Sequence, residues 1–239
     1  MKERLEQIRR FERDSHIEIY STKELYESRS WLQKPIKTVL DIVPMFEEYQ
    51  ELHILDLGSG VGRNSIPFAQ KYAEIPCTIE CVDILELAIE KLKYNAEKYN
   101  VASSIKGIVA PIEEYSIPEN SYDLIMAISA LEHINSEEAF IAKLREIQAG
   151  IRENGIVCLI INSNVVEKDK ATGKGLAPQF EVNLPTAKLQ SLLEQSFKGW
   201  EKIKATVSVQ HYDIPREKGV VELTSNVVTL VARNLCEKV

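Results

Sequence analysis

Three glycines at alternate positions directly follow a run of apolar residues. The run Ile54–Leu57 contains one acidic residue and ends at Gly58, and Gly60 and Gly62 follow before a helical pattern that begins near Ile66. Glycine is needed where a chain turns sharply and where a ligand lies against bare backbone. At the carboxyl end of the first strand of an open α/β sheet, such a turn lies in the ligand crevice. The segment therefore predicts a ligand-binding loop, with a tight turn that binds nothing as the alternative.

The spacing of these glycines distinguishes two kinds of nucleoside cofactor. A dinucleotide fold has the pattern G-x-G-x-x-G, whose third glycine lets helix and strand touch. Arg63 stands at that third position here, so a nicotinamide-dependent oxidoreductase is the disfavoured alternative. The observed G-x-G-x-G suits a ligand without a pyrophosphate. Asp56, two residues before the first glycine, could orient the loop or face a cationic amino group.

A second acidic residue ends the next predicted strand. Asp83 follows Ile79–Val82 and lies 21 residues after Gly62. A carboxylate in that place can accept hydrogen bonds from both hydroxyls of a ribose. It could also cap the helix that begins near Ile84, and the two roles can coexist. We expect Asp83 to bind a ribose.

The elements that would position these residues alternate between strands and helices from residue 52 onward. Helical periodicities cover 84–99 and 136–151, and Ser136 is the expected N-cap of the second. Strands that are apolar on both faces and alternate with helices are typical of a parallel sheet covered by helices. The last two strand-like runs are joined by a short turn, which implies an antiparallel hairpin. The predicted strands are 53–57, 78–82, 105–109, 124–128, 156–161, 200–209 and 220–232.

Residues 1–50 show helical patterns and no strand signal. One helix is expected around Leu5–Phe11, a second after the capping-box pattern of Ser21 and Glu24, and a third from Pro35. We expect these residues to form an N-terminal helical cap and residues 51–239 to form the α/β domain, together as one structural unit. The long connection 162–184 is a candidate lid.

Composition limits the possible classes of protein. The 239 residues are 44% apolar and 27% charged, which excludes a wholly disordered chain. The longest apolar run, Ile156–Ile161, is too short to span a membrane. The net charge of −7 and the lack of a long basic block disfavour nucleic acid. The charged N-terminus favours the cytoplasm, and the four cysteines have no metal-ligand spacing, so no metal is expected.

These motifs together resemble the class I S-adenosylmethionine-dependent methyltransferases. The resemblance rests on Leu55–Gly62, on Asp83, and on Asn120–Ile125 leading to Ala130–Ile134. It implies a Rossmann-like, seven-stranded, mostly parallel sheet with an antiparallel C-terminal hairpin. It also implies S-adenosyl-L-methionine as cofactor and S-adenosyl-L-homocysteine as product. The glycine loop would hold the methionine portion and Asp83 the ribose.

In this family the turn after the third strand frames the adenine. Many relatives have an acidic residue there, whereas this chain has Ala110-Pro111-Ile112. Proline offers neither a carboxylate nor an N–H, so the resemblance leaves adenine contact to Ile112 or Glu113. The residues that the resemblance assigns to the cofactor are Asp56, Gly58, Ser59, Gly60, Gly62, Asp83, Ile84, Pro111, Ile112, Glu113, Ile128 and Ser129.

The methyl acceptor is expected beyond the fourth strand, near His133. Methyl transfer is an in-line displacement that requires positioning and exclusion of water, and a lone-pair nucleophile needs no strong base. His133 could face the acceptor and move a proton, and a helix-end histidine bound by backbone is the alternative. The absence of an Asn/Asp-Pro-Pro-aromatic motif points away from exocyclic amines and glutamine amides. Other candidates on the acceptor side are Tyr20, Arg29, His211 and Arg216.

The loop is also similar to that of the tellurite-resistance methyltransferases, which likewise runs Gly-Arg-Asn-Ser into the helix, here Gly62–Ser65. That similarity implies a small soft acceptor, such as a tellurium or selenium oxyanion or a thiol. We expect a small-molecule substrate, no nucleic-acid or membrane partner, and a monomer or homodimer. A non-catalytic cofactor-binding interaction module is the non-enzymatic alternative.

The ribose role of Asp83 predicts the behaviour of one variant. Asp83→Ala should weaken binding of S-adenosylmethionine by about 1–3 kcal/mol, the scale of lost charged hydrogen bonds. Isothermal titration calorimetry measures this difference. An unchanged affinity would remove Asp83 from the site.

Overall fold

The computed structural model describes residues 2–216 and 219–235, which form strands and helices in alternation through most of the chain. The strands are β1 (Leu52–Leu57), β2 (Cys77–Asp83), β3 (Ile105–Val109), β4 (Tyr122–Ile128), β5 (Ile151–Asp169), β6 (Gly175–Leu176), β7 (Glu201–Arg216) and β8 (Gly219–Arg233). The α-helices are α1 (Lys2–Thr22), α2 (Lys37–Ile42), α3 (Ser65–Lys71), α4 (Glu86–Lys98), α5 (Glu137–Gly150) and α6 (Thr186–Ser196). Short 3-10 turns are η1 (Trp31–Gln33), η2 (Val43–Phe46) and η3 (Leu131–His133).

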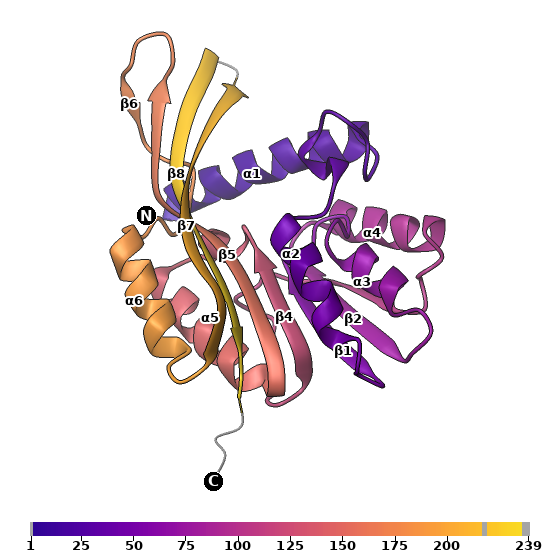
Figure 1. Cartoon of the computed structure of the whole chain (residues 1–239). Helices are drawn as coiled ribbons and strands as arrows, with labels where there is room; N and C mark the ends of the chain where they lie inside the picture. Colours follow the sequence, from indigo (N-terminus) through magenta and orange to yellow (C-terminus); the bar gives the residue numbers. More distant parts are fainter. Residues whose placement is uncertain (1, 217–218, 236–239) are drawn as a thin grey trace.

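The strands form one mixed sheet with helices on both faces (Figure 1). Their order is β3-β2-β1-β4-β5-β8-β7, and the short β6 pairs with β5 off this path. The five strands from β3 to β5 run parallel, whereas β8 is antiparallel to β5 and to β7. The predicted Rossmann-like sheet with an antiparallel C-terminal hairpin is therefore confirmed.

Two apolar layers enclose the sheet because its central strands are buried on both faces. Alternate residues of β1 point to opposite layers, Ile54 to one and Leu55 to the other. The first layer contains Phe46 and the α3 residue Phe68, and the second contains Phe140 of α5. This double burial explains why the central strands appear in the sequence as nearly continuous apolar runs.

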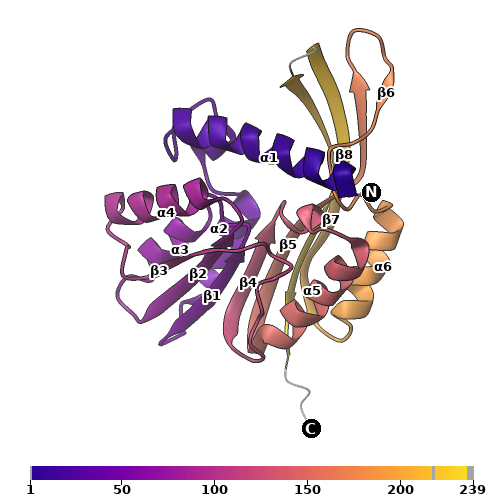
Figure 2. The same ribbon diagram turned by 180° about the vertical axis from the view of Figure 1, so that it is seen from behind.

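Helix α1 crosses over the sheet at the edge where the parallel strands end (Figures 1 and 2). It continues unbroken through Ser21, so the second helix expected after that residue is wrong. Tyr26 and Arg29 have φ angles of 67° and 64°, and this left-handed backbone turns the chain instead of extending a helix. Although α1 has 21 residues, no helix within 2–216 and 219–235 is long and apolar enough to cross a membrane.

The expected loop at 162–184 is partly wrong, because β5 extends to Asp169. Its pairing with β8 continues as far as Asp169 opposite Val221. The distal parts of β5, β7 and β8, together with β6, consequently project past α1 as an arm (Figure 2). Only the segment after β6 returns toward the strand ends, and it reaches the beginning of α6 at Thr186.

Candidate functional site

The glycine loop lies where β1, β2 and β4 end side by side. Gly58, Gly60 and Gly62 all have positive φ angles, of 73°, 53° and 89°. A Cβ atom on Gly58 would lie only 2.4 Å from the Cβ of Ala130, directly after β4. Glycine is thus required there for both conformation and space, and the loop after β1 contacts the turn after β4.

Asp83 connects the end of β2 to this loop. Its carboxylate accepts the Gly60 amide at 2.9 Å through Oδ2 and the Leu85 amide at 2.9 Å through Oδ1. Burial raises the pKa of Asp83, and these two hydrogen bonds oppose the rise. Each carboxylate oxygen can accept a further hydrogen bond, so the arrangement fits a pair of ribose hydroxyls as well as the turn into α4.

Asp56 holds the beginning of α3 below the loop. Its carboxylate accepts a short hydrogen bond from the Ser65 hydroxyl, and the residue is buried. Burial raises the pKa of Asp56 to about 6, although the bond from Ser65 lowers it in part. Of the two roles expected for Asp56, the structure places it in a position to orient the loop.

The turns after β3 and β4 meet the same loop. The Cδ1 atom of Ile112 lies 3.7 Å from the place where a Cβ on Gly58 would stand. Ser129, which follows Ile128, has a φ angle of 52° and donates its amide to the Ile160 carbonyl at 2.7 Å. A positive φ angle in a residue other than glycine marks a turn that its surroundings hold in place. The structure therefore brings the expected adenine turn and the end of β4 to the glycine loop.

Tyr20 of α1 lies on top of the loop. It is buried, and its hydroxyl lies 2.7 Å from the place where a Cβ on Gly60 would stand. Its ring packs against His16 and Trp31, with centroid distances of 5.6 Å and 6.0 Å. Because burial raises the pKa of Tyr20, the phenol stays protonated and can donate a hydrogen bond.

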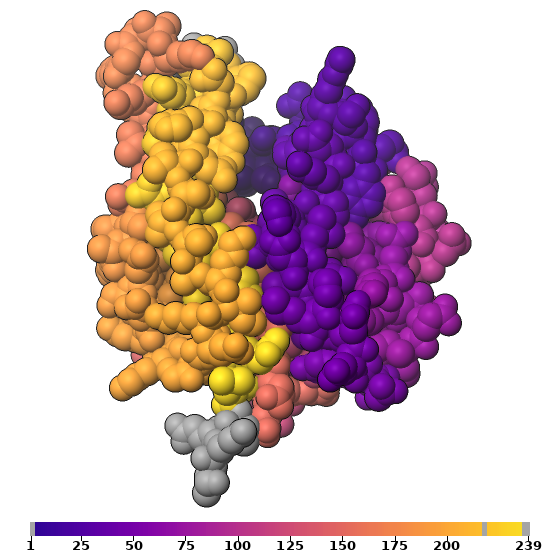
Figure 3. All heavy atoms as spheres, viewed as in Figure 1, coloured from indigo at the N-terminus to yellow at the C-terminus, as the bar shows by residue number. Residues whose placement is uncertain are grey.

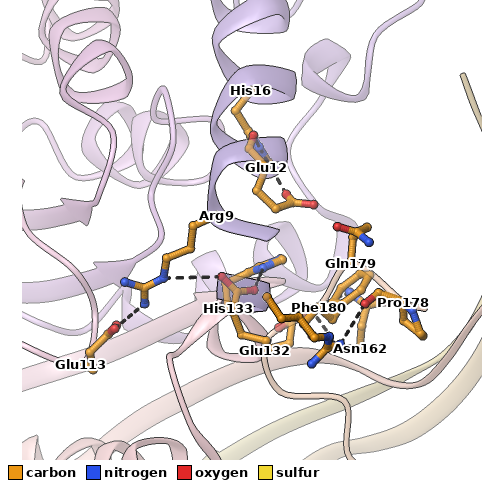
Figure 4. Close-up of polar contacts among 12 residues, drawn as sticks. Arg9, Glu12, His16, Glu113, Glu132, His133, Asn162, Pro178, Gln179 and Phe180 are labelled. Carbon is orange, nitrogen blue, oxygen red and sulfur yellow. Dashed lines mark hydrogen bonds and ion pairs between the residues drawn. The ribbon is translucent and has the colours of Figure 1, made fainter. Parts of the chain in front are cut away.

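A polar network fixes the other half of α1 over the strand ends (Figure 4). The Arg9 guanidinium pairs with Glu113 at 2.5 Å and lies 3.7 Å from Glu181. Glu181 in turn pairs with Nδ1 of His133 at 2.9 Å. The His133 ring stacks on Phe180, with centroids 5.2 Å apart. The network joins α1 to η3, to the turn after β3 and to the segment before α6.

His133 is the one predicted catalytic residue, and its charge depends on this network. Burial by itself lowers the pKa of His133. The hydrogen bond to Glu181 and the negative charges of Glu12, Glu132 and Glu181 outweigh burial and raise that pKa to about 9. The imidazole is therefore a cation at neutral pH.

Glu132 lies completely buried beside His133. Its Oε1 accepts the Asn162 amide at 3.0 Å and the Asn162 side chain at 2.6 Å. Its Oε2 is buried and has no hydrogen-bond partner within the described part of the chain. Burial raises the pKa of Glu132, and the neighbouring His133 lowers it. A buried carboxylate oxygen of this kind can accept a proton or a hydrogen bond.

The remaining candidates lie farther from the loop contacts. Arg216 pairs with Glu167 at 2.8 Å and places its guanidinium 4.6 Å from the centre of the Phe11 ring, so it fixes α1. His211 is exposed on β7, and Arg29 is exposed in the turn after α1. Glu113, expected near the adenine, directs its carboxylate to Arg9 of α1. Ile84 is 49% exposed beside Asp83.

Two residues of this network, Arg9 and Glu181, have no signal in the sequence, whereas Glu113 is expected at the adenine and pairs with α1 instead. Arg9, Glu113 and Glu181 come together only because α1 folds across the sheet. Figure 3 shows a hollow between the C-terminal strands and the N-terminal segment, with α1 behind it. The hollow lies on the side of the molecule where the parallel strands end (Figure 1).

Parts of this chain are similar to a known family model and to known proteins. Residues 54–155 match the family model described as a methyltransferase domain. A carboxy-S-adenosyl-L-methionine synthase of Vibrio atlanticus is 26% identical over 122 residues, which are 51% of this chain and 48% of that protein. An ajmaline N-methyltransferase of Rauvolfia serpentina is 25% identical over 134 residues, 56% of this chain and 43% of the relative. The chain thus spans about half the length of the curated relatives it matches.

Solved structures share the fold. The crystal structure of TehB from Haemophilus influenzae superposes with a TM-score of 0.62 at 20% identity, over 83% of this chain and 62% of the other. A 1,6-didemethyltoxoflavin-N1-methyltransferase of Burkholderia thailandensis, solved with bound 1,6-didemethyltoxoflavin and S-adenosylhomocysteine, superposes with a TM-score of 0.55 at 16% identity. That match covers 94% of this chain and 87% of the other.

The His133–Glu181 pair predicts a pH-dependent contribution to stability. A histidine whose pKa is raised from 6.5 to about 9 stabilises the fold fully below pH 6.5 and loses that effect as the pH rises toward 9. Glu181→Gln should therefore lower the pKa of His133 in an NMR titration. It should also lower the free energy of unfolding by about 2 kcal/mol at pH 6, with a smaller loss at pH 9.

Glu153→Gln is the matched control, because Glu153 is exposed at the start of β5. Glu153→Gln should leave both the pKa of His133 and the free energy of unfolding unchanged. If Glu181→Gln left the titration of His133 as it is in the original chain, the pair would not set the charge of that imidazole.

Proposed function

We propose that this chain, a member of the class I S-adenosylmethionine-dependent methyltransferases, transfers a methyl group to a small-molecule acceptor. The observation that carries the proposal is the meeting of the bare glycine loop with the Asp83 carboxylate beneath α1. The sulfonium of S-adenosylmethionine supplies an activated methyl group for in-line displacement. The protein then has to hold the acceptor in line with that group and exclude water.

On the cofactor side, each candidate residue has a role that its position supports. Asp83 would accept the ribose hydroxyls through its remaining lone pairs, and the backbone at Gly58 and Gly60 would border the methionine portion. Ile112 would pack against the adenine because it borders the same loop. The protonated Tyr20 phenol would donate to the cofactor from above. Residues 1–50 would accordingly act as the cover of the site and residues 51–239 as the domain beneath it.

On the acceptor side, η3 and α1 would enclose the reacting group. His133 is held by Glu181 and Phe180, which fixes the direction of its ring. Glu132 adds a buried carboxylate oxygen next to that ring. In this arrangement the imidazolium can orient an electron-rich acceptor, while Glu132 can accept the proton that the acceptor loses.

The acceptor that we propose is a thiol, with a tellurium or selenium oxyanion as the second candidate. The similarity of Gly62–Ser65 to the loop of the tellurite-resistance methyltransferases supports a soft nucleophile of either kind. The charges favour the thiol, because Arg9 and His133 are each already paired with carboxylates and Glu132 brings a further negative charge. A site with this balance of charges binds a neutral thiol more readily than a permanent oxyanion, because the thiol loses its proton only after it has entered the site.

Two measurements test this function. Calorimetry should detect binding of S-adenosylmethionine and S-adenosylhomocysteine. Asp41→Ala is the control, because Asp41 is an exposed acidic residue of α2. This variant should bind both ligands as tightly as the original chain. Release of S-adenosylhomocysteine should then be followed with simple alkyl and aryl thiols, tellurite, selenite and amines. Turnover with thiols at neutral pH is the expected result.

Each of the two measurements can fail independently, and each failure would reject a different part of the proposal. Absence of cofactor binding at high micromolar ligand would overturn the methyltransferase function. Binding accompanied by turnover of amines alone would keep the function and reject the acceptor class. Binding without turnover of any acceptor in a broad panel would favour a non-catalytic binding module.

A further inference from the structure

Arg63, which directly follows the glycine loop, carries a positive charge without a carboxylate partner among the described residues. Its Nη1 donates to the Trp31 carbonyl at 2.7 Å, and its Cζ lies 4.9 Å from the centre of the Trp31 ring. Arg9 and Arg216 differ, because each of them pairs with a glutamate. Burial lowers the pKa of Arg63, but a guanidinium stays charged in proteins. Arg63 therefore has N–H donors left for an anionic group of a ligand.

Strand β7 forms the other wall of the hollow between the C-terminal strands and the N-terminal segment (Figure 3). Lys204 of β7 donates to the Thr38 hydroxyl of α2 at 2.7 Å, so the face of β7 that contains Lys204 points to the N-terminal segment. The pairing of β7 with β8 is regular beyond Lys204, and side chains alternate along a strand. Gln210 and Tyr212 consequently lie on that same face. Burial raises the pKa of Tyr212, and the charge of Arg63 lowers it in part, so the phenol lies within electrostatic reach of Arg63.

Two exposed aromatic side chains lie beside this guanidinium. Trp31 is 42% exposed and Tyr212 is 50% exposed. The Trp31 ring also packs against Tyr20, which lies on the glycine loop, with the two ring centroids 6.0 Å apart. An aromatic ring binds a second ring by offset stacking or by edge-to-face contact. Arg63, Trp31 and Tyr212 together therefore suit a ligand that has both an aromatic ring and an anionic group.

The same face of the sheet leads from the hollow to Glu132. Gln210 of β7 lies opposite Ser225 of β8. The Ser225 hydroxyl donates to Oδ1 of Asn162 at 2.9 Å, and the Asn162 side chain donates to Oε1 of Glu132 at 2.6 Å. The other oxygen of Glu132 is buried without a hydrogen-bond partner in the part of the chain that the structure describes. A row of polar side chains thus connects the β7 wall to the carboxylate that we propose as the proton acceptor.

We propose that the methyl acceptor is an aromatic carboxylic acid and that Arg63 binds its carboxylate in the hollow. This inference rests on the proposed function and specifies the acceptor of the same site. The aromatic ring would lie between Trp31 and Tyr212, and the reacting group, such as a thiol, would face Glu132. This orientation keeps the permanent negative charge of the acceptor away from the Glu132 carboxylate. The methionine end of S-adenosylmethionine also has a carboxylate, but the exposed rings beside Arg63 favour the acceptor.

Ligand-observed NMR with benzoate and with benzamide, its neutral analogue, tests the proposal in the absence of S-adenosylhomocysteine and at saturation with it. The original chain should bind benzoate about tenfold more tightly than benzamide, because only the carboxylate accepts charge-assisted hydrogen bonds from Arg63. Arg63→Gln should remove this preference, and Arg63→Lys should restore part of it. Arg145→Gln is the matched control, since Arg145 is exposed on α5, and it should keep the preference in full. Circular dichroism establishes that the variants fold.

Equal binding of benzoate and benzamide by the original chain, or an unchanged preference in folded Arg63→Gln, would overturn the proposal. Should Arg63→Gln fail to fold, a preference in Arg63→Lys equal to that of the original chain would overturn it instead. Calorimetry with S-adenosylhomocysteine and with methylthioadenosine, which lacks the amino-acid end, tests the second source of a carboxylate. If Arg63→Gln weakens binding of S-adenosylhomocysteine alone and keeps the benzoate preference, Arg63 binds the cofactor and the proposal is wrong. A benzoate preference in a chain that does not bind S-adenosylhomocysteine would reject the methyltransferase function but keep Arg63 as a carboxylate site.

Discussion

The arrangement of the site depends on how the polar helix α1 is held across the ends of the parallel strands. Within α1 only Ile8 and Tyr20 are fully buried among the apolar side chains, so hydrophobic burial alone contributes little to its position. Instead, Arg9 holds the helix in place by pairing with Glu113 from the turn after β3 and with Glu181 from the segment before α6. Ion pairs at partly buried positions of this kind fix geometry more than they add stability. The same contact therefore orients three parts of the site at once.

The ion pairs of Arg9 position two groups of residues, one at the glycine loop and one at η3. Toward the loop, α1 places the Tyr20 phenol on Gly60, and Gly60 in turn donates its amide to Asp83. Toward η3, Glu181 holds the His133 imidazolium while the ring stacks on Phe180. The two directions correspond to the proposed cofactor and acceptor sides. A single cover that touches both sides can exclude water from the position between them, which displacement at a sulfonium methyl requires.

The sequence alone predicts the framework of this site but only part of its chemistry. The G-x-G-x-G loop, Asp83 and the parallel strands follow from local patterns, because turn geometry and strand periodicity are encoded within a few residues. The sequence does not predict the continuous α1, because left-handed turns at Tyr26 and Arg29 override the capping pattern of Ser21. The pairing of Arg9 with Glu181 joins residues far apart in the chain, and no local pattern reports it. Arg216, expected on the acceptor side, pairs instead with Glu167, which is also far away in the sequence.

Amide hydrogen exchange can test directly whether α1 covers the proposed cofactor site. Exchange should be measured for the whole chain with and without S-adenosylhomocysteine, with α6 as the internal reference. We expect the ligand to slow exchange in α1 from residue 9 to residue 22, together with the glycine loop, and to leave α6 unchanged. Protection of the glycine loop with no change in α1 would mean that the ligand binds without touching this helix, and α1 would then not be the cover of the site.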